Sequence, residues 1–86
     1  MLFPSGQIVA TPGVLEAIPR SAMIAALRRH LQGDWGDVDA EDRQANDWSV
    51  KNAARILSSY KHGDTVFWIL TESTREATTF LLPAEY

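Results

Sequence analysis

Residues 56–71 have the sequence ILSSYKHGDTVFWILT, in which two β-type segments flank a polar turn. The change of period predicts strands over residues 56–61 and 65–72, and His62-Gly63-Asp64 between them is typical of a hairpin turn. The second segment has bulky residues on both faces, with Val66, Trp68 and Leu70 on one face and Phe67, Ile69 and Thr71 on the other. We therefore expect this strand at the centre of a sheet.

The rest of the chain surrounds this hairpin with further predicted elements. A polar loop through Ala77 leads to a third strand over residues 78–82, which completes a three-stranded antiparallel meander. Upstream, residues 7–10 are typical of a short strand, 12–18 of a helical turn, 21–32 of a helix capped by Ser21, and 40–55 of a helix capped by Asp39. The predicted fold class is α+β, with a short N-terminal strand, two to three helices and then the meander.

Length and composition predict a single domain over residues 1–86. The chain is 45% hydrophobic and 22% charged, which is ordinary for a globular protein. It has no cysteine, which argues against a disulfide framework and thiolate metal ligands. The N-terminus lacks a signal-peptide pattern and no stretch is long enough to span a membrane, so we expect a cytoplasmic protein without membrane contact. The net charge of −3 argues against a nucleic-acid partner.

Acidic residues are densest between the two long predicted helices, at Asp34, Asp37, Asp39, Glu41, Asp42 and Asp47. Calcium or magnesium binding would need alternate oxygen ligands and a bidentate carboxylate about twelve positions after the first. These acids do not have that spacing, and no metal is expected. Two interpretations stay open: an acidic strip that mimics nucleic acid, and a solvated face with acids at a helix N-terminus.

The three tryptophans differ in their expected environments. Trp68 is expected in the core, whereas Trp35, between two glycines, is expected either to plug one end of the core or to present an anchor on the acidic loop. At about 100° per residue, Trp48 lies about 160° from Val50 and therefore faces away from the core. Exposed indoles often centre protein interfaces. The candidate partner-binding residues are Trp35, Trp48, Asp34, Asp37 and Glu41.

No catalytic or cofactor-binding residues are predicted. His30 is on a helix flank, His62 is in the hairpin turn, and neither has a partner at a recognisable spacing. The loop over residues 71–76 gathers hydroxyls, carboxylates and Arg75, and a polar turn with ion pairs is the favoured interpretation. Nucleotide-binding glycine motifs are missing. We therefore expect a protein that is not an enzyme.

Three strings resemble a family of small bacterial proteins described as plasmid-related or hypothetical. They are GQIVATPG at residues 6–13, RRH at 28–30 with GDWGD at 33–37, and LLPAEY at 81–86. Some members are labelled as type I restriction methylation subunits, but this chain has neither an adenosylmethionine glycine loop nor an Asn-Pro-Pro-aromatic motif. The resemblance implies an accessory role in a mobile-element setting.

These observations favour a non-enzymatic protein-interaction or accessory module of a bacterial mobile element or phage-defence setting. Its partner would be another protein or a second copy of the chain. The alternative is an acidic nucleic-acid mimic that inhibits a restriction or CRISPR-type nuclease, and a small hydrolase or toxin ranks third.

Overall fold

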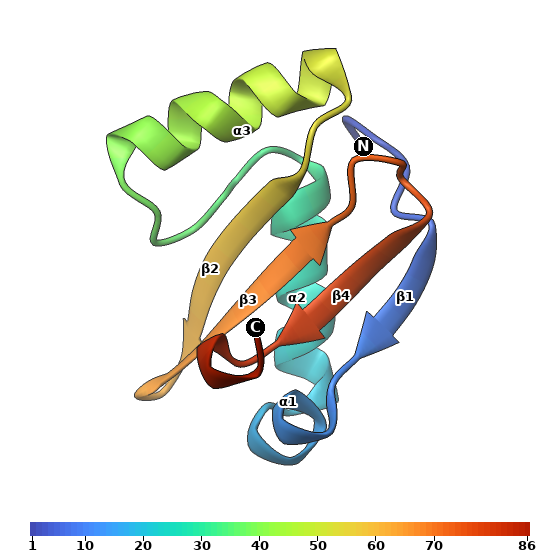
Figure 1. Cartoon of the computed structure of the whole chain (residues 1–86). Coiled ribbons are helices and arrows are strands. Elements are labelled where there is room, and N and C mark those ends of the chain that lie inside the picture. The colour runs from blue at the N-terminus through green and yellow to red at the C-terminus, as the bar shows by residue number, and fades with distance from the viewer.

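Four strands form one mixed sheet in the computed structural model, which describes residues 1–86 (Figure 1). They are β1 (Gln7–Ala10), β2 (Ile56–His62), β3 (Thr65–Thr71) and β4 (Ala77–Leu81), in the order β1-β4-β3-β2. β2, β3 and β4 pair antiparallel with their chain neighbours, and β1 pairs parallel with β4. The α+β class is confirmed. The sheet is larger than the predicted three-stranded meander because the N-terminal strand joins it.

Three α-helices lie between β1 and β2, and a short 3-10 turn follows β4: α1 (Pro12–Ala17), α2 (Arg20–Leu31), α3 (Ala40–Asn52) and η1 (Pro83–Glu85). Ser21 is not the cap of α2, because the helix already begins at Arg20 after Pro19. α3 ends before the predicted Arg55, because Ala53 adopts a left-handed conformation with φ of 50° and the chain then enters β2. None of these helices combines the length and apolar character that a membrane span requires.

The main core lies between α2 and one face of the sheet (Figure 1). Its buried residues are Val14, Ile18, Ala26, Tyr60, Phe67, Ile69 and Phe80. A second cluster of Phe3, Trp35 and Ile56 packs with half-buried Val38 and Val50. The opposite sheet face is partly covered by the C-terminus, where Tyr86 makes an edge contact with Trp68 at a ring-centroid distance of 5.8 Å.

Candidate protein-binding surface

An amide side chain attaches α3 to the edge of β2. Asn46 Nδ2 donates a hydrogen bond of 2.8 Å to the Leu57 carbonyl, and the Leu57 N–H donates one of 3.2 Å to Asn46 Oδ1. Asn46 thereby substitutes for a neighbouring strand at this edge. At the start of α3, Asp39 Oδ1 accepts a hydrogen bond of 2.8 Å from the Asp42 N–H, which confirms Asp39 as the cap.

The loop before α3 closes the next part of the same edge. The Ser59 N–H donates to the Trp35 carbonyl at 3.1 Å, and the Asp37 N–H donates to the Ser59 carbonyl at 2.7 Å. Gly36, between them, has φ of 75°, and a Cβ at this position would lie only 2.0 Å from the Ser59 carbonyl oxygen. Only glycine therefore fits, and this close approach fixes where Asp37 lies beside the sheet.

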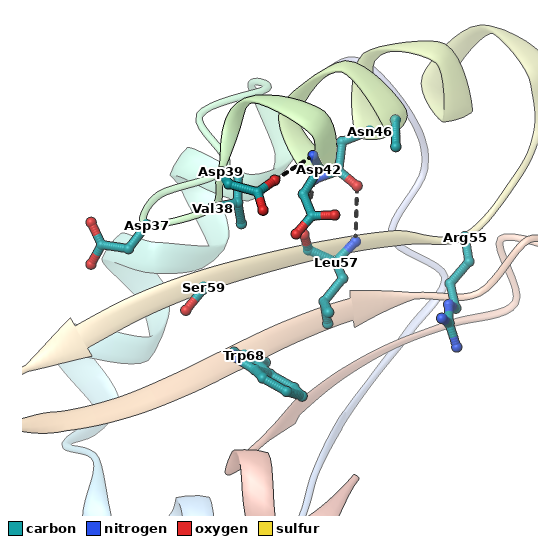
Figure 2. A pocket seen from close by; sticks show the side chains of 10 residues that line it. Asp37, Val38, Asp39, Asp42, Asn46, Arg55, Leu57, Ser59 and Trp68 are labelled. Atoms are coloured by element: carbon teal, nitrogen blue, oxygen red, sulfur yellow. Dashed lines mark hydrogen bonds between the residues drawn. The ribbon is translucent and has the colours of Figure 1, made fainter.

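A groove of about 520 Å³ lies between α3, this loop and the exposed sheet face (Figure 2). Leu57, Ser59 and Trp68 line it from β2 and β3, and Ala45 and Asn46 line it from α3. The remaining lining residues are Asp37, Val38, Asp39, Asp42 and Arg55. In Figure 2 the carboxylates of Asp37, Asp39 and Asp42 lie on the α3 side of the groove. Its volume is typical of sites that take a small molecule or a few side chains.

The three carboxylates of the groove have no ion-pair partner. The chain has one ion pair, between Arg29 Nε and Asp34 Oδ2 at 2.8 Å, outside the groove. Arg55, at the other end of the groove, instead donates a hydrogen bond to the Tyr86 hydroxyl and lies 5.6 Å from the centre of that ring. The groove therefore presents negative charge beside apolar surface.

Trp48 lies on the side of α3 that faces away from the sheet, and 60% of it is exposed. The prediction that this tryptophan points to solvent is confirmed. Helical spacing places three residues beside it: Glu41, seven residues before it, Ala45, three before it, and Asn52, four after it. Because Ala45 also lines the groove, the indole and the groove belong to adjoining surfaces. We call Trp48, Glu41, Ala45 and the groove together the α3 surface.

Trp35 does not belong to this surface, and its assignment as a partner anchor is wrong. It is 3% exposed, stacks against Phe3 at 6.2 Å, and its Nε1–H donates to Asp47 Oδ1 at 2.9 Å. The indole plugs the second core cluster, and its bond to Asp47 fastens the loop to α3. Between the two interpretations that the sequence left open, the structure selects the core plug.

The acidic candidates are divided between different environments. Asp34 accepts two hydrogen bonds from the Arg29 guanidinium, at 2.8 and 3.1 Å, and these bonds lower the pKa of its carboxyl. Asp37 lies in the groove, and Glu41 is exposed in the first turn of α3. The structure therefore gathers Asp37, Glu41 and Trp48 on the α3 surface and leaves Asp34 outside it.

A buried polar network was missed by the sequence analysis, which found no partner for His30. The fully buried ring of His30 contacts Ser58 Oγ at 2.5 Å through Nδ1 and Thr71 Oγ1 at 2.8 Å through Nε2. Thr71 Oγ1 in turn lies 2.8 Å from Thr78 Oγ1, which donates to the Ser5 carbonyl at 2.6 Å.

The end of this network fixes the direction of every hydrogen bond in it. The Ser5 carbonyl can only accept, so Thr78 donates to it, Thr71 donates to Thr78, and Nε2–H of His30 donates to Thr71. Nδ1 is left to accept from Ser58. His30 is therefore the neutral Nε2–H tautomer, and burial lowers its pKa to about 4. The side chains of His30 and Ser58 are closed to solvent, so they stabilise the core in this arrangement.

Arg75, from the polar loop before β4, supports the end of α3. Its guanidinium donates to the carbonyls of Ser49, Ala54 and Glu72 at 2.9, 2.7 and 3.0 Å. The Ser49 carbonyl, in the last turn of α3, also accepts from the Ala53 and Ala54 N–H groups, and Ala54 follows the helix. A cation near a helix C-terminus is favourable. In this loop, Arg75 thus acts as a cap that no local sequence pattern revealed.

We expect Arg75→Ala to lower the free energy of unfolding by about 1 to 2 kcal/mol, because three charge-assisted hydrogen bonds at a partly exposed site are lost. Arg75→Lys should recover only part of this loss, since one ammonium group cannot reach all three carbonyls. Urea unfolding of the three proteins measures the effect. Equal stability of wild type and Arg75→Ala would contradict this role.

No protein-family model, curated protein or solved structure matches the chain. The side chains that could ligate a metal form no group of three or more.

Proposed function

We propose that the chain is a non-enzymatic protein-interaction module and that the α3 surface is its binding site. One observation carries the proposal: Trp48 is 60% exposed on α3, the helix that also forms one wall of a groove whose carboxylates have no ion-pair partner. A tryptophan left in water exposes a large apolar area, whereas in a protein interface it is among the residues that contribute most to binding.

The chemistry of the α3 surface favours a partner segment that carries lysine or arginine beside an apolar side chain. Asp37, Asp39 and Asp42 in the groove and Glu41 near Trp48 attract positive charge. Leu57 and Trp68 on the groove floor offer apolar contact, and Trp68 also offers an aromatic face for a guanidinium. Complementary charges raise the association rate and fix the register of such a contact.

The rigid attachment of α3 supports the same function. Its N-terminus is capped by Asp39, its middle is fixed to β2 by Asn46, and its end is held by Arg75. A surface that is already ordered loses little conformational entropy when it binds. The resemblance of residues 33–37 and 81–86 to plasmid-related bacterial proteins supports an accessory role in a mobile-element or phage-defence setting.

We expect Trp48→Ala to abolish partner capture while the fold is retained. The tagged wild-type chain and the variant would each be incubated with lysate of the source cell, and the bound proteins compared by quantitative mass spectrometry. A specific partner should be enriched on wild type at least tenfold over Trp48→Ala. Ile24→Ala, which removes an exposed apolar side chain from the outer face of α2, is the matched control and should capture like wild type. Equal capture by wild type and Trp48→Ala would exclude the α3 surface as the binding site.

A second candidate function is inhibition of a restriction or CRISPR-type nuclease by mimicry of nucleic acid. The observation that favours it is the set of carboxylates at Asp37, Asp39 and Asp42 along one side of the groove, none of which has an ion-pair partner. The double variant Asp37→Asn, Asp42→Asn separates the two functions. Mimicry predicts a nuclease as the partner, binding that weakens steeply with salt, and a larger loss from the double variant than from Trp48→Ala.

A further inference from the structure

The outer edge of β1 has free backbone hydrogen-bonding groups. The Gln7 N–H donates to the Glu76 carbonyl at 2.9 Å and the Thr11 N–H donates to the Phe80 carbonyl at 3.0 Å, so alternate residues from Gln7 face β4. Ile8 and Ala10 therefore direct their N–H and C=O groups away from the sheet. β4 is the only neighbour of β1.

The β2 edge of the sheet is covered by other parts of the chain, whereas the β1 edge is not. At the β2 edge, the Asn46 amide pairs with Leu57 and the Trp35–Asp37 backbone pairs with Ser59. Proteins usually protect a sheet edge with such covers, with charges or with proline. Gln7-Ile8-Val9-Ala10 has none of these. Figure 1 shows β1 uncovered at the side of the sheet opposite β2.

β1 itself has no charged side chain. The 8 basic and 11 acidic side chains of the chain all occur at residue 16 or later. Ile8 and Val9 of β1 are among the eight large apolar side chains that are exposed. Two copies of β1 can therefore pair without placing like charges directly opposite one another on the strands. Beyond the end of the strand, the carboxylate of Glu85 accepts hydrogen bonds from Thr11 and Gly13 of its own chain.

We propose that β1 pairs antiparallel with β1 of a second copy, across a two-fold axis at Val9. In this register Ile8 faces Ala10 of the second copy in both symmetry-related pairs, and every outward N–H and C=O of the two strands finds a partner. Ile8 and Val9, which are 47% and 39% exposed, each gain a cross-strand contact, with Ala10 and Val9 of the second copy respectively. The pairing stops where Pro12 starts α1, because proline has no N–H to donate. The α3 surface is at the opposite edge and stays free in both copies.

Cysteine substitution tests this register directly, because the chain has no cysteine of its own. Val9 would face Val9 of the second copy at a Cα distance of about 4.5 Å, which suits a disulfide. Gln7 lies on the same sheet face, but its two copies would be about 13 Å apart along the strands. We expect mild oxidation to convert Val9→Cys rapidly to a species of twice the 9.6 kDa monomer mass, and to leave Gln7→Cys and Ile24→Cys monomeric.

Amide hydrogen exchange of the unmodified protein provides an independent readout. The N–H groups of Ile8 and Ala10 should become protected as the concentration is raised, whereas those of Gln7 and Val9, bonded to β4, should be protected at every concentration. Cross-linking of Val9→Cys no faster than of Gln7→Cys would overturn the proposal. Exchange at Ile8 and Ala10 that does not depend on concentration would also overturn it, as would a Val9→Cys disulfide formed only with a different protein.

Discussion

Lowering the pH from 7 to 4.5 is expected to reduce the free energy of unfolding by about 2 to 3 kcal/mol through His30 alone. Burial lowers the pKa of His30 from 6.5 to about 4, because the charged ring would lose its hydration inside the core. In the unfolded chain the same side chain takes up a proton near pH 6.5. Between these two values the unfolded state binds more protons than the folded state. The stability due to His30 is therefore complete above pH 6.5 and is lost as the pH falls toward 4.

The pH window separates His30 from the acidic side chains. Hydrogen bonds from Arg29 and Thr11 lower the pKa of Asp34 and of Glu85, respectively, so their contributions are lost only as the pH falls through those lowered values. Urea unfolding between pH 7 and 4.5 therefore reports mainly on the buried ring. His62→Gln, at the exposed end of β2, should retain the full pH dependence, whereas His30→Gln should lose most of it even though it is less stable at neutral pH. A wild-type stability that stays constant across this window would show that His30 is not buried in its neutral form.

Asn46→Ala is expected to lower the free energy of unfolding by about 2 to 3 kcal/mol, an unusually large effect for a polar residue of an otherwise exposed helix. Both of its hydrogen bonds to the Leu57 backbone would be lost, and alanine leaves the N–H and C=O of that residue without a partner at a partly buried edge. α3 buries only Asn46 and Ser49, so it has little apolar packing with which to compensate.

Gln44→Ala provides the matched control, because Gln44 is an exposed amide on the same helix. This control should change the stability by less than about 0.5 kcal/mol. Equal effects of the two substitutions would mean that the Asn46 amide does not hold α3 against β2. Thermal unfolding monitored by circular dichroism distinguishes these outcomes.

Periodicity in the sequence predicted those features that depend on local geometry. The alternation through Val66, Phe67 and Trp68 placed β3 correctly inside the sheet, and the helical phase placed Trp48 on the exposed side of α3. Gly33 and Gly36 around Trp35 marked a sharp turn, and both have positive φ. A glycine turn does not specify whether its tryptophan points inward, so the burial of Trp35 follows only from its tertiary contacts.

Features that depend on contacts between distant segments were not predicted. Ser58 and Thr71 follow His30 in the sequence by 28 and 41 residues, respectively. Each of the three resembles a surface polar residue in its own segment. Asn46 has the same local pattern as an exposed helix residue, although it is buried against β2. The parallel pairing of β1 with β4 joins the two ends of the chain and has no signature in either strand. Polar pairing across the fold, unlike apolar periodicity, has no local pattern.

The central claim, that Trp48 belongs to a binding site and not to the core, is tested most directly by measuring binding and stability on the same variant. Isothermal titration of the captured partner should give a Kd for Trp48→Ala at least about 30-fold above that of wild type, equivalent to about 2 kcal/mol. The free energy of unfolding of the variant, without partner, should stay within about 1 kcal/mol of wild type. A Kd unchanged by the substitution, or a loss of several kcal/mol in folding stability, would contradict the account.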